Sequence, residues 1–335
     1  MGNRQVILSA IMTGVLAWTS CAVTVSEVWE SLRNHGIPFD SDKVMEAAVH
    51  GALSALDPSA RIVTTEDLDS LFVGDVMVCC EKWAEGICYV KLGGMFPNGG
   101  GQLSGKLREL LPDCETGLIV DLRGSGGTDL ACMDEIARIL LRGGTAHYKV
   151  KHGTNTTIHT IGVLSGDNIA PECMEYFLPH MPLVIVIDAA TVGASEVLAA
   201  ILKGRSYTVL VGMPTSDGLN LRGIVPLPAG EMLYMVTHQV VLTDGLGALA
   251  GGVDPDIFVS CDKSGTVVRT PDKFDPRRRE LSDQALRDRE LMIRVSGDPA
   301  LSRTVDMLLG LRALSGIRQA ENAVLSDVNY GNDKE

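Results

Sequence analysis

Continuous apolar runs and helically spaced apolar residues take turns along the 335-residue chain. Short apolar runs bounded by glycine or aspartate are typical of buried strands. They fall at Gly117–Arg123, Leu183–Asp188 and Tyr207–Gly212. Apolar residues three or four positions apart indicate helices between and after these runs, at 103–111, 133–141, 195–202 and 301–311. Strands that alternate with helices predict a layered α/β core.

The N-terminal region shows a different pattern. Residues 26–56 predict two amphipathic helices, the second one beginning near Asp42. Ahead of them, Arg4 precedes an apolar stretch from Val6 to Trp18 and then the small residues 19–22. This order is typical of a secretory signal peptide over residues 1–22, removed after Ala22. We therefore expect an exported protein, in the periplasm, cell envelope or outside the cell. A lipoprotein modified at Cys21 and a retained membrane anchor are the alternatives.

Charge and cysteine content narrow the range of functions. The net charge of −13 disfavours nucleic acid as a partner and docking of a basic patch on an anionic membrane. The eight cysteines include no C-x-x-C pair, and no histidines show metal-ligand spacing, so we expect no metal and no cofactor. Buried free thiols are the simplest interpretation of the cysteines, although an oxidising compartment would permit disulfides.

The most informative segment is residues 189–218. Thr191-Val-Gly-Ala-Ser-Glu196 lies at a strand-to-helix turn, and Gly212-Met-Pro-Thr215 follows in the same segment. It resembles the core of the tail-specific (carboxyl-terminal processing) serine peptidases of family S41, whose turn reads T-A-S-A-S-E. The resemblance puts Gly193 in the place of the nucleophilic serine and Gly218 in the place of the general-base lysine. Both members of the catalytic dyad are therefore replaced by glycine.

Other motifs carry the resemblance from about residue 25 to 312. They are Gly51–Ser59, which lacks the family histidine, Glu85–Leu92, Gly117–Thr128 and Gly251–Ile257. The resemblance implies a layered, ClpP/crotonase-like α/β peptidase core over residues 71–262 with closing β-hairpins. A helical segment at 23–70 would precede this core, and a helical extension and tail at 263–335 would follow it. No room remains for the PDZ domain common in the family.

The resemblance also implies that Ala194 and Gly127 supply backbone donors of an oxyanion hole. Ser195 is the fallback nucleophile, but a serine in a first helical turn is more typical of a cap. Lys203 is expected to be a solvated charge at a helix end, and Asp217 a turn residue. None of His147, His152, His159, His180 and His238 lies in a motif that marks it as a base.

Three functions remain open at this point. The favoured one is a non-catalytic S41-like protein that binds a peptide or protein C-terminus or acts as a scaffold, with open space where the dyad side chains are missing. The alternative is an atypical serine peptidase that acts on protein C-termini through Ser195. The third is a structural partner of an active paralogue.

Overall fold

The computed structural model describes residues 23–72, 77–97, 100–141, 145–162, 181–228, 230–243, 251–260 and 291–314. The expected signal peptide with Cys21, His180, and most of the expected C-terminal extension lie outside these residues. The chain divides into two compact units, Met1–Arg61 and Ile62–Glu335, which are described separately below.

Two helices make up the described part of the first unit, as the sequence predicts. Helix α2 spans Val25–Asn34 and helix α3 spans Ser41–Leu56. Thr24 and Glu27 form a reciprocal capping box at the start of α2, and Asp40 caps α3 by accepting two backbone N–H bonds. None of the described helices has the length and the apolar content needed to cross a lipid bilayer.

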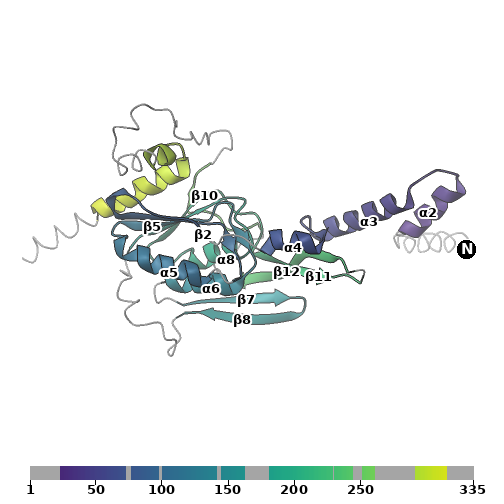
Figure 1. Ribbon diagram of the computed structural model, residues 1–335, viewed down its shortest axis with the longest axis horizontal. Coiled ribbons are helices and arrows are strands. Elements are labelled where there is room, and N and C mark those ends of the chain that lie inside the picture. Colours follow the sequence, from purple (N-terminus) through teal and green to yellow (C-terminus); the bar gives the residue numbers. More distant parts are fainter. Residues whose placement is uncertain are drawn as a thin grey trace, which may run out of the picture. The chain divides into compact units, whose positions relative to one another are not determined.

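A six-stranded sheet forms the centre of the second unit (Figure 1). Its order is β13-β10-β9-β5-β3-β2, and all neighbours run parallel except β2, which is antiparallel to β3. The bounds are β2 Met77–Lys82, β3 Ile87–Leu92, β5 Gly117–Asp121, β9 Leu183–Ile187, β10 Thr208–Gly212 and β13 Ile257–Phe258. Strands β5 and β9 are buried along their whole length, which explains their continuous apolar sequences.

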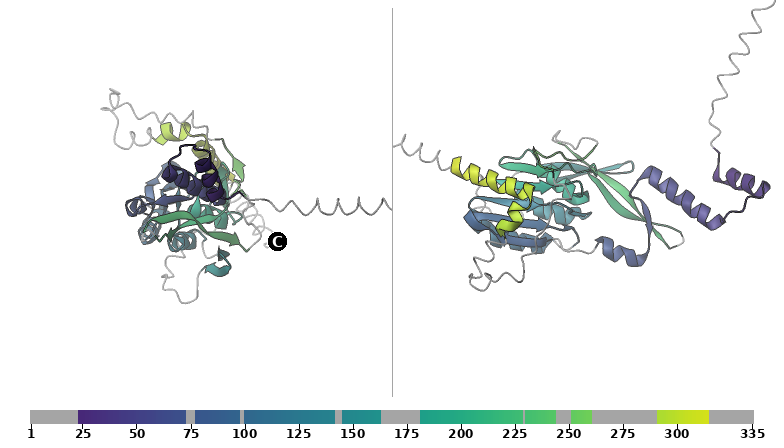
Figure 2. Two further views of the ribbon diagram at one scale, coloured as in Figure 1. Left: turned by 90° about the vertical axis from the view of Figure 1, so that its right-hand side faces the viewer. Right: turned by 90° about the horizontal axis from the view of Figure 1, so that it is seen from above.

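Helices cover both faces of this sheet (Figure 2). Successive residues of β5 point to opposite faces of the sheet, so Leu118 and Ile119 belong to two different apolar clusters. The first cluster includes residues of α5 Gly100–Leu110, α6 Leu130–Leu140 and α8 Gly193–Leu202. The second cluster includes residues of the C-terminal helices at 291–296 and 299–314. The layered α/β core expected from the sequence is therefore present.

A second, mostly antiparallel sheet has the order β1-β12-β7-β8, with β11 paired to β12. Its strands are β1 Arg61–Val63, β7 Ala146–His152, β8 Asn155–Ile161, β11 Asn220–Pro226 and β12 Met232–Leu242. The antiparallel pair β11–β12 is the closing hairpin expected from the sequence. The short elements are α4 Thr65–Phe72, η1 Ala84–Gly86, η2 Leu111–Asp113, β4 Gly94–Met95 and β6 Gly126–Gly127.

The prediction of buried free thiols is wrong for one pair of cysteines. Cys88 of β3 and Cys114, just before β5, form a disulfide with Cα atoms 5.4 Å apart. Pairing of β3 with β5 brings these residues together from 26 positions apart, and no local sequence pattern marks that contact. Cys79, Cys80 and Cys132 are free.

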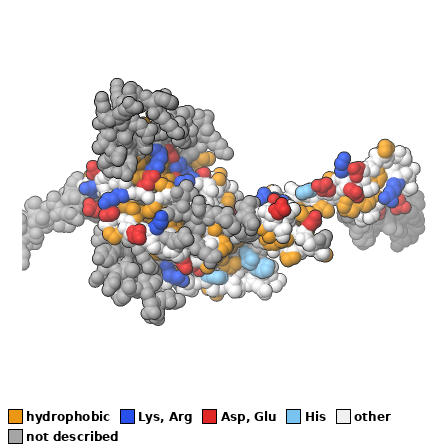
Figure 3. Space-filling model, viewed as in Figure 1, with side chains coloured by type: hydrophobic (Ala, Val, Ile, Leu, Met, Phe, Trp, Pro, Cys, Tyr) orange, Lys and Arg blue, Asp and Glu red, His pale blue; other side chains and the backbone are white. Residues whose placement is uncertain are grey.

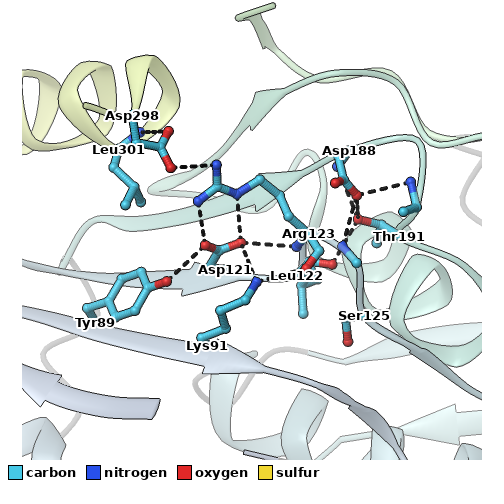
Figure 4. A network of polar contacts seen from close by, with 12 residues as sticks. Tyr89, Lys91, Asp121, Leu122, Arg123, Ser125, Asp188, Thr191, Asp298 and Leu301 are labelled. Atoms are coloured by element: carbon cyan, nitrogen blue, oxygen red, sulfur yellow. Dashed lines mark hydrogen bonds and ion pairs between the residues drawn. The ribbon is translucent and has the colours of Figure 1, made fainter. Parts of the chain in front are cut away.

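A buried ion-pair network joins the sheet to the C-terminal helix (Figure 4). The Asp121 carboxylate accepts a hydrogen bond from the Tyr89 hydroxyl and pairs with Arg123 and Lys91. Burial acts to raise the pKa of Asp121, but these two cations outweigh it and hold the pKa below its usual value. Arg123 also pairs with Asp298 at 2.7 Å, and Asp298 accepts N–H bonds at the start of helix 299–314. Asp121 and Arg123, at the end of β5, therefore anchor this helix.

Candidate functional site

The turn between β9 and α8 is fixed to the loop that follows β5. The Thr191 hydroxyl donates to the Leu122 carbonyl oxygen at 2.9 Å, and the Asp188 carboxylate accepts the Gly124 N–H at 3.0 Å (Figure 4). The Val192 N–H donates to the Ser125 carbonyl oxygen. These bonds place the glycine loop of residues 124–128 beside the first turn of α8.

Gly193 begins α8 in a conformation that excludes a side chain. Its φ is +62°, in the left-handed region, and an added Cβ would lie 2.3 Å from the Gly127 carbonyl oxygen. Gly127 is equally constrained, because its own Cβ would lie 2.2 Å from the Met95 carbonyl oxygen. The expectation of open space at Gly193 is therefore wrong, since backbone from β6 fills the place that a side chain would need.

Gly218 differs from Gly193 in its surroundings. Its φ is +68°, but an added Cβ would meet only the Asn220 amide nitrogen, at an ordinary contact distance of 3.6 Å. The expected open space therefore exists on this side of the site. The next residue, Leu219, also has a positive φ, of +59°. Two successive residues with left-handed backbone conformation, Gly218 and Leu219, bend the loop sharply at the position that corresponds to the general-base lysine of the family.

Asp217 connects this loop to the start of α8. Its Oδ2 accepts the Gly193 N–H at 3.2 Å, and both of its oxygens pair with the Arg222 guanidinium at 2.7 and 2.6 Å. The Asp217 side chain is only 7% exposed and that of Arg222 17% exposed. A carboxylate near a helix N-terminus is stabilised by the helix dipole, and the arginine neutralises it further. Asp217 is thus a turn residue, as expected, with a defined partner in the vacated site.

Glu196 is a structural residue whose role the sequence did not reveal. It is fully buried, and its carboxylate accepts N–H bonds from Leu219 at 2.7 Å and Asp217 at 3.2 Å and a hydroxyl bond from Thr215. Burial raises its pKa above the usual value, although these hydrogen bonds act in the opposite direction. The only charged residue of the fully buried helix α8 was the available signal, because a buried charge requires partners.

Ser195 lies in the first turn of α8, and its hydroxyl makes two hydrogen bonds. The side chain is buried, the hydroxyl donates to the Gly126 carbonyl oxygen at 2.8 Å, and the Ser125 hydroxyl lies 2.7 Å away. The helix-capping role expected for Ser195 is wrong, because Val192 is the N-cap residue and the Asp217 carboxylate, not Ser195, accepts the first N–H of α8. Ser195 instead ties α8 to the glycine loop, next to the buried Ala194.

The remaining candidate bases have other contacts. His152 and His238 face each other across β7 and β12 with ring centroids 4.4 Å apart. His159 stacks on Tyr148, and His147 bonds to a threonine of β8. Lys203 ends α8, as expected, and its ammonium group donates to the Asp254 carbonyl oxygen. Over the described ranges, no histidine or lysine bonds to Ser195, and no three potential metal ligands come together.

The second unit is thus a layered α/β core in which helix α8 starts at a glycine-lined turn. A model of peptidase family S41 matches residues 86–259, just over half of the chain, and the chain therefore belongs to this family. A carboxyl-terminal-processing protease of Picosynechococcus sp. is 26% identical over 187 residues, which are 55% of this chain and 42% of that protein. The chain thus matches less than half the length of this relative.

Solved structures are similar in fold. The photosystem II D1 C-terminal processing protease is 22% identical with a TM-score of 0.42, over 54% of this chain and 47% of that chain. A lipoprotein from Streptococcus agalactiae is 20% identical with a TM-score of 0.49, over 69% of this chain and 84% of that chain. A peptidase-like protein from Parabacteroides merdae is 15% identical with a TM-score of 0.49, over 73% and 84%.

Proposed function

We propose that this protein is a non-catalytic member of the S41 family that acts by binding a partner protein or as a scaffold. The observation that carries the proposal is the packing at Gly193. This residue occupies the nucleophile position, and its backbone conformation leaves no place for a hydroxyl-bearing side chain.

The chemistry of hydrolysis supports this proposal. Serine–lysine catalysis requires a hydroxyl on a sharp turn, an unprotonated amine within hydrogen-bond reach, and donors for the oxyanion. Gly193 supplies no nucleophile and Gly218 supplies no base. Loss of a serine nucleophile reduces the rate by about a millionfold in the serine peptidase subtilisin. Backbone donors at Gly127 and Ala194 could stabilise an oxyanion only after a nucleophile has attacked the substrate, and the dyad positions supply no nucleophile.

The geometry of Ser195 weighs against the alternative of an atypical peptidase. A nucleophilic serine must reach a substrate carbonyl carbon and give its proton to a base. The Ser195 proton is directed at the Gly126 carbonyl oxygen, which does not act as a base, and the side chain is buried. Rotation toward substrate would break this bond and leave buried polar atoms without partners.

Asp217 decides which kind of partner is favoured. Its carboxylate already accepts hydrogen bonds from the Gly193 N–H and from the guanidinium of Arg222. A free C-terminal carboxylate approaching this point would find the Gly193 N–H and the Arg222 guanidinium already paired with Asp217. The proposal therefore favours an internal extended segment or a protein surface over a terminal carboxylate as the ligand, and neither ligand requires a paralogue.

A fluorophosphonate probe tests the proposal directly, because it modifies only an activated serine. We expect no labelling of the purified protein, and no cleavage of unfolded protein or of peptides with apolar C-termini. An active S41 peptidase serves as the positive control. Labelling that disappears in the Ser195→Ala variant would overturn the proposal and establish the peptidase alternative.

A further inference from the structure

Strand β8 forms one margin of the second sheet. The β7–β8 hairpin turns through Gly153 and Thr154, and β8 follows β7 at the end of the strand order (Figure 1). Among the described residues, no strand pairs with the outer side of β8. An edge of this kind carries a row of backbone donors and acceptors that can pair with another extended chain.

The sequence of β8 lacks the usual protection of an exposed edge. Natural edge strands carry lysine, proline, inward charges or bulges that prevent pairing. Strand β8 reads Asn-Thr-Thr-Ile-His-Thr-Ile, with five β-branched residues, no proline, no glycine, and no Asp, Glu, Lys or Arg. Its register with β7 is continuous, without a bulge, and the Ile158 side chain is 68% exposed. The strand is therefore well suited to accept a further strand.

The register identifies the backbone groups that point outward. His152 and Asn155 are opposite each other and flank the two-residue turn, which makes them a hydrogen-bonded pair. Such pairs alternate along an antiparallel ladder, so the N–H and C=O groups of Thr156, Ile158 and Thr160 point away from β7. These three residues would pair with an added strand.

The surface beside this edge is basic. His147, Lys149 and Lys151 of β7 are opposite Thr160, Ile158 and Thr156, and opposite residues project from the same face of a sheet. Residues 145–162 contain no aspartate or glutamate, although the whole chain has a net charge of −13. Histidine side chains are visible on the surface near the turn end of the hairpin (Figure 3). A second copy of this chain would bring two equally basic hairpins together, whereas an acidic segment would be attracted.

We propose that the outer edge of β8 accepts an extended acidic segment of a partner protein by antiparallel strand addition. The backbone of Thr156, Ile158 and Thr160 supplies the pairing, and Lys149 and Lys151 attract carboxylates on the same face. This inference rests on the proposed binding function and gives that function a location and a partner chemistry. Because directly opposite residues share a face, acidic side chains alternate along the bound segment.

A peptide titration tests this inference. The probe is a fluorescein-labelled peptide with the repeat Glu-Val-Glu-Val-Glu-Val, and the matched control has lysine at each glutamate. We expect saturable binding of the acidic peptide, weakened about fivefold in the variant Lys149→Ala/Lys151→Ala, from two partly exposed charge contacts. The variant Lys43→Ala/Lys82→Ala removes the same charge elsewhere and should bind like the wild type. N-methylation of the glutamate amides should abolish binding, because these amides face β8.

Backbone amide exchange gives a second readout. On addition of the acidic peptide, exchange should slow at Thr156, Ile158 and Thr160, while Thr157 and His159 already bond to β7. Equal binding of the acidic and basic peptides, or binding without protection of these three amides, would overturn the inference. Protection of the same amides by self-association would show that a second copy is the occupant and would equally overturn it. Fluorophosphonate labelling reports covalent modification and is independent of this titration, so the two proposals can fail separately.

Discussion

The backbone amide of Gly193 donates a hydrogen bond to the carboxylate of Asp217, 24 residues later in the chain. This contact joins the first turn of α8 to the loop that carries Gly218. In the family resemblance, these are the positions of the nucleophile and of the general base. An aspartate neutralised by Arg222 thus links the two segments that a peptidase would use for its dyad.

Restoring the serine should destabilise the protein. A side chain at position 193 meets the Gly127 carbonyl oxygen and must adopt a positive φ, so we expect Gly193→Ser to lower the free energy of unfolding by about 2–3 kcal/mol. Chemical denaturation measures the change. The control is Gly101→Ser in α5, where an added Cβ meets nothing within 4 Å. A fully stable Gly193→Ser/Gly218→Lys variant that cleaves peptides would contradict the proposed loss of the site.

The Asp217–Arg222 pair should be coupled. Both side chains are largely buried, so removing one of them takes the opposite charge away from the other in a poorly solvated place. We expect Asp217→Asn and Arg222→Met each to cost about 2 kcal/mol, and the double variant to cost clearly less than the sum. The exposed pair Lys82–Asp113 provides the comparison, with a coupling energy of about 0.5 kcal/mol or less. Additive losses at Asp217 and Arg222 would show that the pair contributes nothing as a unit.

Glu196 should give stability a dependence on pH. Burial raises the pKa of its carboxyl in the folded state above the unfolded value. The folded protein therefore binds this proton more tightly, and its contribution to stability is complete below the unfolded pKa and lost as pH rises through the folded pKa. We expect the stability difference between wild type and Glu196→Gln to shrink as the pH rises above the ordinary glutamate pKa of about 4.3.

Urea denaturation of wild type and Glu196→Gln in parallel from pH 4 to 8 measures this difference, because titrations common to both proteins cancel. A wild-type advantage that grows with pH would show that the hydrogen bonds from Thr215, Leu219 and Asp217 dominate over burial.

Export remains a prediction with a direct test. Residues 1–22 have the composition of a signal peptide, and a disulfide between Cys88 and Cys114 is typical of oxidising compartments. On expression in a bacterial host, mass spectrometry should find a mature chain that begins at Val23, with Cys88 and Cys114 linked. A lipid adduct on Cys21 would instead establish the lipoprotein alternative. Intact Met1 on cytoplasmic protein with reduced cysteines would contradict export altogether.

Much of the fold was predictable because its signals are local. Burial of both faces explains the continuous apolar runs of β5, β9 and β10. Burial of one face explains the spacing of apolar residues within helices such as α6. The order of the strands within each sheet was not predictable in this way, because long stretches of sequence separate most paired strands and the apolar pattern does not identify the neighbour of a strand. The β7–β8 hairpin was missed although only two residues join its strands.

The sequence by itself determined the family, the succession of the main buried strands and helices along the chain, and the presence of glycine at positions 193 and 218. Motifs and periodicity depend on neighbouring residues, which is why they can be read without the structure. Only the tertiary structure decided that Ser195 bonds to Gly126, that Cys88 pairs with Cys114, and that Asp217 meets Gly193. Each of these contacts joins residues 24 or more positions apart. The packing of α8 against the glycine loop and the Asp217 loop sets two of them, and the pairing of β3 with β5 sets the disulfide. The sequence alone shows that glycine replaces the two dyad side chains. It does not show that the backbone of Gly127 fills the space beside Gly193.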